Sequence, residues 1–302
     1  MSQNTTSPHH EPGDATAPRT TSLDLVANGR TLVEIQERID RHALSETIPD
    51  VEGVMATLTP PDQLTWSGGY AWSVVPGPDG RTIRARTTRK EIREFYEWRT
   101  SLDVTESAVP ALTDIRSTWY GFQEPFPAVM RDVNTGEVSR IIYSVALFTM
   151  DGHEGITSEI VWLRIDDVSL DVGARVTQWQ AYLAALRSQD SGKLVDLMTP
   201  DVQGAVRDYG GMDPPFVAIH GADEMRGQYD RMFDQYEVRR VDILQSHIAE
   251  WFVFHELMLT LKTRDESVAE RDFICRIAEY MPFDLTGKFQ GRCGYGTELL
   301  PI

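Results

Sequence analysis

The feature that most constrains the fold is a single order of helices and strands that runs twice along the chain. Residues 30–166 and 174–300 each contain a helical hairpin, a strand pair, a third helix and a run of long strands. The third helices match most visibly, one preceded by Thr87 and the other by Gly221. A helical hairpin followed by a strongly bent sheet encloses a cone, so this order predicts two cones, one of which has kept chemistry.

Apolar spacing and turn residues set the expected elements. In the first half they predict helices over 32–39, 50–58 and 90–101 and strands over 64–75, 81–86, 114–122, 128–132, 138–149 and 156–165. In the second half they predict helices over 176–188, 192–198 and 223–236 and strands over 202–209, 216–220, 239–247, 251–263, 269–283 and 288–297. The fold class is therefore α+β, with two tandem cone-shaped domains.

The expected domains are residues 29–166 and 174–302, joined by a polar linker over 166–173. Residues 1–28 are rich in Ser, Thr, Pro and His, a composition that predicts a disordered tail. The strand over 251–263 is apolar on both faces, so one face covers the local core and the other meets a second sheet. The natural second sheet is that of the first half, which predicts an internal pseudo-dimer.

Charge and motif content exclude several classes of function. The net charge of −17 opposes binding to nucleic acid or to an anionic membrane. No long apolar run or signal-peptide pattern occurs, so we expect a soluble cytoplasmic protein. The two cysteines, Cys275 and Cys293, are expected to be buried free thiols. No HxxxH, HxH or CxxC spacing occurs, and we predict neither a metal nor a cofactor.

The doubled order resembles the nuclear-transport-factor-2-like fold, which includes ketosteroid isomerases, SnoaL-like polyketide cyclases and limonene-epoxide hydrolases. The resemblance covers about 260 of the 302 residues. The second half is closer to ketosteroid isomerase, in the segments 182–190 and 278–288 and in the third helix that begins at Gly221. It implies bent sheets wrapped on three helices, packed sheet to sheet.

The resemblance implies a site in the second half, in which a tyrosine and a carboxylic acid donate to a developing enolate and an aspartate moves the proton. By position the tyrosine is Tyr182, the acid is Glu279 and the base position is Val206, which cannot move protons. Asp208 faces the same side of the strand and is the replacement base, or else a solvated acid at a strand end. Tyr182 is a hydrogen-bond donor in this hypothesis and a core tyrosine in the alternative.

Arg292 complicates the role of Glu279. A two-residue turn in the last hairpin would set Arg292 opposite Glu279, and a guanidinium lowers the pKa of a carboxyl that the isomerase role needs raised. Three alternatives remain open: Arg292 points outward, Glu279 is an ionised general base, or the pair is structural and binds an anionic group of the substrate. Further substrate-contacting candidates are Phe254, Glu256 and Met281. His255 lies on the other face of its strand from Glu256, and both rank below Tyr182 and Glu279.

In the first half the corresponding positions fall near His42, Trp66 and Ser144, so the constellation is not repeated. His42 is an acid or base candidate if it faces inward, and Trp66 belongs to an aromatic set that either fills the cone or binds a flat apolar ligand. The leading hypothesis is a cofactor-independent enzyme that moves protons on a small apolar carbonyl compound as an isomerase, cyclase, hydratase or dehydratase. The alternative is a non-catalytic ligand-binding or scaffolding module.

Overall fold

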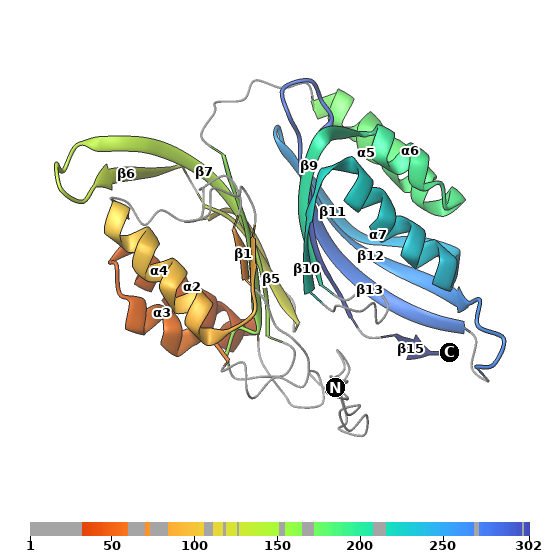
Figure 1. Ribbon diagram of the computed structural model, residues 1–302, viewed down its shortest axis with the longest axis horizontal. Helices are drawn as coiled ribbons and strands as arrows, with labels where there is room; N and C mark the ends of the chain where they lie inside the picture. The colour runs from red at the N-terminus through yellow and green to blue at the C-terminus, as the bar shows by residue number, and fades with distance from the viewer. Residues whose placement is uncertain are drawn as a thin grey trace, which may run out of the picture.

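A computed structural model of the chain describes residues 32–59, 70–72, 84–105, 111–116, 119–125, 127–150, 155–164, 172–207, 216–268, 272–297 and 299–302. These residues form two β-sheets that stand side by side, with helices covering the outer side of each sheet (Figure 1). The predicted α+β class is confirmed. The expected tail over 1–28, most of the linker, Trp66 and Asp208 lie outside the described residues.

The first half contains three described helices and eight strands. The helices are α2 (Leu32–Thr47), α3 (Val51–Thr57) and α4 (Arg89–Leu102). The strands are β1 (Tyr70–Trp72), β2 (Arg84–Arg86), β3 (Asp103–Thr105), β4 (Ala111–Arg116), β5 (Tyr120–Pro125), β6 (Ala128–Asp132), β7 (Val138–Thr149) and β8 (Ser158–Arg164). They pair in the order β2-β1-β8-β7-β5-β4, and β6 joins β3 to β7.

The second half contains three described helices and seven strands. The helices are α5 (Val172–Ser188), α6 (Ser191–Asp196) and α7 (Gly221–Gln235). The strands are β9 (Met198–Arg207), β10 (Phe216–His220), β11 (Tyr236–Ile248), β12 (Phe252–Thr263), β13 (Asp272–Pro282), β14 (Phe289–Gly296) and β15 (Leu300–Pro301). They pair in the order β10-β9-β14-β13-β12-β11, and β15 pairs with β13.

Both sheets follow one connectivity. Each sheet is antiparallel throughout the described pairs except at one inner pair, β1 with β8 in the first and β9 with β14 in the second. The second helix of each half starts at an aspartate cap, because Asp50 accepts from Gly53 N and Asp190 accepts from Lys193 N, both at 2.9 Å. In the main path of both sheets, the first strand pair is thus followed by the last strand of that half and then by the preceding strands in reverse order.

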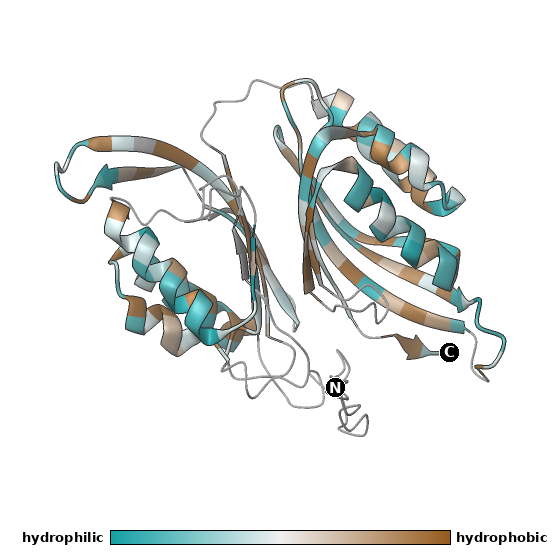
Figure 2. Ribbon diagram, viewed as in Figure 1, coloured by the Kyte–Doolittle hydropathy of each residue, from teal (hydrophilic) through white to brown (hydrophobic). Residues whose placement is uncertain are grey.

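The core has three parts, one under each set of helices and one between the sheets. Every residue of β12 from Phe252 to Leu257 is buried, as expected for a strand covered on both faces. Phe254 stacks on Phe122 of β5 with ring centroids 4.3 Å apart. The hydroxyl of Tyr280 donates to the backbone oxygen of Ile160 at 3.2 Å. In Figure 2 the outward turns of α4 and α7 are largely hydrophilic, while brown bands cross the strands.

Cys275 and Cys293 are buried and free, as predicted. The last hairpin is longer than the expected two-residue turn, because Asp284 N donates to Lys288 O and Gly287 takes a φ of +92°. Within the described parts of the chain, no helix combines the length and apolar character that crossing a bilayer needs.

Candidate functional site

The first candidate site is a buried polar group in the second half, here called the Tyr182 cluster: Tyr182, Tyr229, His255, Glu279 and Arg292. Tyr182 projects from α5 and Glu279 from β13, and both are fully buried. The hydroxyl of Tyr182 donates to Oε2 of Glu279 at 3.4 Å. The structure thus brings together the two residues that the resemblance placed in one site.

Arg292 binds Glu279 through both carboxylate oxygens. Its Nε lies 3.0 Å from Oε2 and its Nη2 lies 3.1 Å from Oε1, and only 2% of Arg292 is exposed. The expectation that Arg292 stands directly opposite Glu279 is wrong, since the longer hairpin sets Gly294 opposite Glu279. Arg292 reaches the carboxylate diagonally, across the gap left by the glycine.

His255, which the sequence ranked below Tyr182 and Glu279, also lies in the cluster. It pairs with Glu279 across β12 and β13, so both side chains face α5. The indole Nε1 of Trp179 donates to Nδ1 of His255 at 3.1 Å. An indole nitrogen is only a donor, so Nδ1 carries the lone pair and the ring proton sits on Nε2. That Nε2 is buried without a hydrogen-bond partner and lies 3.9 Å from Oε2 of Glu279.

Burial controls protonation in this cluster. It lowers the pKa of His255 to about 4, so the ring is neutral at neutral pH. Burial and the charge of Glu279 raise the pKa of Tyr182 well above its ordinary value, so its hydroxyl keeps the proton. Tyr229 donates to the hydroxyl oxygen of Tyr182 at 3.4 Å, and its pKa is also raised by burial. The cluster therefore holds two neutral donors, Tyr182 O–H and His255 Nε2–H, beside one ion pair.

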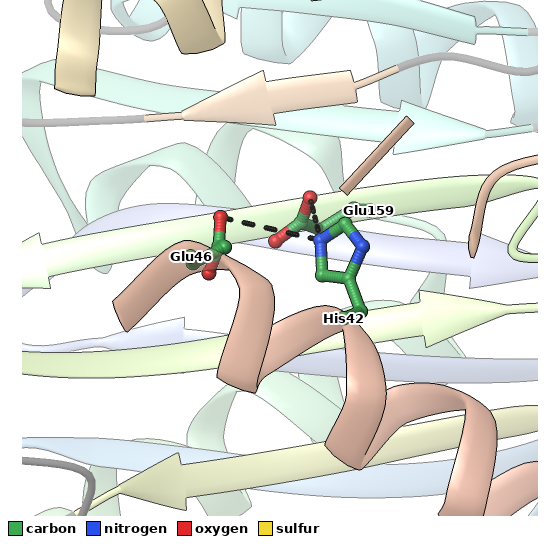
Figure 3. Close-up of side chains that lie close together, drawn as sticks. All are labelled: His42, Glu46 and Glu159. Carbon is green, nitrogen blue, oxygen red and sulfur yellow. Dashed lines mark ion pairs between the residues drawn. The ribbon is translucent and has the colours of Figure 1, made fainter. Parts of the chain in front are cut away.

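The second candidate site lies in the first half and is here called the His42 cluster: His42, Glu46, Tyr96 and Glu159. Figure 3 shows Glu46 on the helix α2 and Glu159 on the neighbouring strand β8, both approaching the ring of His42. His42 Nε2 lies 3.4 Å from Glu159 Oε2 and 4.0 Å from Glu46 Oε1. Among the described residues, one donor atom from each of these three lies within 4.8 Å of the others, a spacing that could hold a metal ion.

The tautomer of His42 is set by Thr57. The Thr57 hydroxyl donates to Val54 O at 2.6 Å, so its oxygen accepts from His42 Nδ1 at 2.7 Å. Nε2 therefore faces the two glutamates, and the hydroxyl oxygen of Tyr96 lies 3.3 Å from it. Burial acts to lower the pKa of His42, but the carboxylates of Glu159 and Glu46 together outweigh it and the pKa is raised. Tyr96 donates to Glu159 Oε2 at 2.7 Å, and burial raises the pKa of Glu46.

The two clusters occupy matching positions in their halves. His42 precedes Asp50 by the same number of residues as Tyr182 precedes Asp190. These two aspartates cap the helices α3 and α6. A buried residue of the first helix thus faces the sheet in both halves, as an imidazole in one and as a phenol in the other.

The third helix and the inner strand also match. Tyr96 follows Glu91 by the same number of residues as Tyr229 follows Glu224. Oε2 of each of these glutamates accepts a hydrogen bond from a backbone N–H at the start of its helix, α4 or α7. Glu159 likewise follows Ile156 by the same number of residues as Arg292 follows Phe289. Ile156 and Phe289 each form a parallel β-bridge to the residue at the end of the helical hairpin in their own half. The first half thus has a buried polar cluster at corresponding positions, but with His42 in place of Tyr182 and Glu159 in place of Arg292.

The remaining predicted residues are distributed over both faces of the second sheet. Met281 and Val206 are buried in the same core as Tyr182. Phe254 and Glu256 point the other way, into the layer between the sheets. Glu256 Oε2 there accepts from Tyr120 at 3.1 Å and from Gln245 at 2.9 Å, and its Oε1 pairs with Arg276. The geometry does not bring these two residues to the Tyr182 cluster.

Three members of the clusters were not predicted from the sequence in these places: His255 as a hydrogen-bond donor, and Glu46 and Glu159 as partners of His42. The alternation of β12 placed His255 and Glu256 on opposite faces but did not say which face held the site. A glutamate one turn after His42 on one helix face was a usable signal for Glu46. Glu159 is the single acidic residue of a predicted strand and is followed directly by four apolar residues, which marks a buried partner.

No protein-family model matches the chain, and no curated protein matches it. Solved structures do. An LEH-like epoxide hydrolase from M. tuberculosis is 15% identical with a TM-score of 0.32, over 41% of this chain and 83% of that one. A ketosteroid isomerase-like protein from Erwinia carotovora atroseptica is 18% identical with a TM-score of 0.33, over 41% and 95%. An NTF2-like protein from Burkholderia xenovorans is 10% identical with a TM-score of 0.34, over 42% and 92%. At these scores the likeness carries no functional inference.

Proposed function

We propose that the chain is a duplicated nuclear-transport-factor-2-like protein and a cofactor-independent enzyme that moves a proton on a small apolar carbonyl compound. The shared strand order of the two sheets supports the duplication, as do the matching positions of the two clusters. The aromatic layer between the sheets supports an internal pseudo-dimer. The reaction is assigned to the Tyr182 cluster.

The observation that carries the proposal is the partnerless Nε2–H of His255, which lies 3.9 Å from the same Glu279 Oε2 that accepts from the hydroxyl of Tyr182. A buried donor without an acceptor is costly, and such groups concentrate where an acceptor arrives with the ligand. A carbonyl oxygen between the two donors accepts one hydrogen bond from His255 Nε2 and one from Tyr182, which gives up its bond to Glu279 Oε2. The bonds strengthen as the oxygen gains negative charge, which lowers the barrier to forming an enolate.

Glu279 is the base in this proposal. Its carboxylate takes the proton from the carbon beside the carbonyl, the C–H electron pair becomes the enolate double bond, and the carbonyl π pair moves onto the oxygen held by Tyr182 and His255. The protonated Glu279 then returns the proton to the same or a conjugated carbon. Because Arg292 stabilises the ionised carboxylate, Glu279 is a weak base and suits an acidified C–H.

The test uses 2-tetralone, an apolar ketone with an acidified C–H, and follows deuterium uptake from D₂O by proton NMR. We expect catalysed exchange, with losses of about 10² to 10³ in rate for Tyr182→Phe and for Glu279→Gln. Tyr295→Phe is the matched control, because its hydroxyl is also buried but bonds Leu147 O between the sheets. Exchange that is equally fast in all of these variants would show that the Tyr182 cluster is not the active site.

A second candidate function is a non-catalytic ligand-binding or scaffolding module. It is favoured by the double engagement of Glu279, since both oxygens already bind Arg292. In that case 2-tetralone perturbs the NMR signals of His255 without any gain in deuterium uptake over the buffer rate. Binding without exchange therefore separates the two candidates.

A further inference from the structure

We propose that the His42 cluster is a binding site for a divalent first-row transition metal ion such as Zn²⁺, with His42, Glu46 and Glu159 as its ligands. The proposal departs from the prediction of no metal made from the sequence. It does not depend on the function proposed for the Tyr182 cluster, because the two clusters share no residue.

The spacing of the donor atoms fits such an ion. Bonds of about 2.0 to 2.1 Å at tetrahedral angles place neighbouring ligand atoms about 3.3 Å apart. His42 Nε2 and Glu159 Oε2 are 3.4 Å apart, so this edge is already formed. Glu46 Oε1, 4.0 Å from the same nitrogen, completes the triangle by a small rotation of a side chain at the rim of the cluster.

The second observation is how His42 is held. Metal-bound histidines almost always donate their other ring N–H to a fixed acceptor, which orients the ring and sets the tautomer. Thr57 supplies that acceptor at 2.7 Å, because its own proton is used on Val54 O. The lone pair of a neutral His42 therefore sits on Nε2, the nitrogen that faces both carboxylates.

The third observation is an unused acceptor. Glu46 Oε1 is buried and has no hydrogen-bond partner, whereas Glu159 Oε2 accepts from Tyr96 at 2.7 Å. Ligating carboxylates commonly keep such a second hydrogen bond, so Tyr96 and an ion can share Glu159. Glu46 keeps 15% of its side chain exposed, while His42 and Glu159 keep at most 1%, so an ion enters past Glu46.

Charge and donor type select the ion. Two carboxylates and one neutral imidazole carry a charge of −2, which suits a divalent cation, and the nearby guanidinium of Arg99 offsets part of that charge. A mixed set of one nitrogen and two oxygens suits Zn²⁺, Fe²⁺ or Mn²⁺ better than soft Cu(I). Three ligands leave a fourth position open, as in catalytic rather than structural sites.

The test is titration of the full chain with Zn²⁺ by calorimetry and with Co²⁺ by visible absorption, after removal of metal with a chelator. His9 and His10 form a separate histidine pair, so the titrations use the variant His9→Ala/His10→Ala. We expect one equivalent to bind, with affinity lowered at least about tenfold by Glu46→Gln, by Glu159→Gln and by Thr57→Val. Glu37→Gln, an exposed glutamate on the same helix, should bind as the parent does.

Melting temperatures measured with and without Zn²⁺ distinguish a loss of metal binding from poor folding of a variant. Zn²⁺ should raise the melting temperature of the parent and of Glu37→Gln, because it binds only the folded state, and should leave that of Glu46→Gln unchanged. Glu46 lies at the rim, so this variant is the least disruptive. Absence of binding at millimolar Zn²⁺, or binding that Glu46→Gln and Glu159→Gln leave unaltered, would overturn the proposal.

Discussion

The indole Nε1 of Trp179 donates to Nδ1 of His255 at 3.1 Å, and this one hydrogen bond decides which ring nitrogen of His255 faces the Tyr182 cluster. Because Nδ1 is the acceptor, the proton lies on Nε2, which is 3.9 Å from Glu279 Oε2, and the imidazole ring stacks on Tyr182 with ring centroids 5.8 Å apart. The proposed donor pair therefore depends on a tryptophan that is not itself one of the donors.

Trp179→Phe should remove that control while keeping an aromatic ring in the core. We expect a loss of about 1 to 3 kcal/mol in the free energy of unfolding, because Nδ1 of a buried histidine loses its partner. The tetralone exchange rate should fall as well. Chemical denaturation measures the stability, and Trp98→Phe, on a half-buried tryptophan of the first half, is the control. An unchanged stability and rate would mean that Trp179 does not position His255.

The pH dependence of stability should carry the signature of His255. Its pKa is about 4 in the folded state and near 6.5 in the unfolded chain, so the unfolded chain binds the proton first as the pH falls. The free energy of unfolding should therefore drop between pH 6.5 and 4, by of order 3 kcal/mol from this group. The raised pKa of His42 acts in the opposite sense, stabilising at low pH and losing that contribution as the pH rises through its folded value.

His255→Gln isolates the contribution of His255, since glutamine does not titrate. Denaturation of both proteins from pH 4 to pH 8 should show the difference between them changing across the window from 6.5 to 4, in favour of the variant at the acid end. A difference that stays constant with pH would mean that His255 titrates near its ordinary pKa.

The buried pair of Glu279 and Arg292 should be costly to break from one side. Arg292→Met leaves an ionised carboxylate without its guanidinium, and we expect a loss of about 3 to 5 kcal/mol in stability. The double variant Arg292→Met/Glu279→Gln should recover part of that loss, because no charge is then left buried alone. A double variant that is less stable than the sum of the single changes would contradict this reading.

Much of the element order could be predicted from the sequence, because apolar spacing and Gly-containing turns are local signals. The strands over 128–132, 138–149 and 216–220 match the structure to the residue. The two-sided burial of β12 followed from apolar residues on both of its faces. The short strands β3 and β15 were not predicted, because two or three residues carry no periodicity. The single strand expected over 114–122 is wrong, since this segment belongs to two antiparallel strands, β4 and β5.

The site was harder to predict, because it depends on register between distant segments. Because the hairpin is longer than expected, Gly294 and not Arg292 pairs with Glu279 in the sheet. The side chain of Arg292 is long enough to reach the carboxylate of Glu279 from its own position. Glu159 and His42 meet only when α2 covers the sheet of the first half, and no local pattern gives that contact. The resemblance named Tyr182 and Glu279 as one site, whereas the place of His255 depends on its tertiary contact with Trp179.

The contact between the two sheets is testable through Phe122 and Phe254. Each Phe→Ala change should lower stability by about 3 to 5 kcal/mol, since both rings are fully buried. A double-mutant cycle should give a coupling of about 0.5 to 1.5 kcal/mol from the stacked pair. Additive losses would mean that the two rings do not stack in solution.

The tautomer of His255 is the most direct measurement of the donor pair. Nitrogen-15 NMR of the imidazole, with the signal assigned by comparison with His255→Gln, separates a protonated from an unprotonated ring nitrogen. From pH 5.5 to 8 we expect a neutral ring with its proton on Nε2 and the lone pair on Nδ1. A proton on Nδ1, or a doubly protonated ring in this range, would contradict the proposed site.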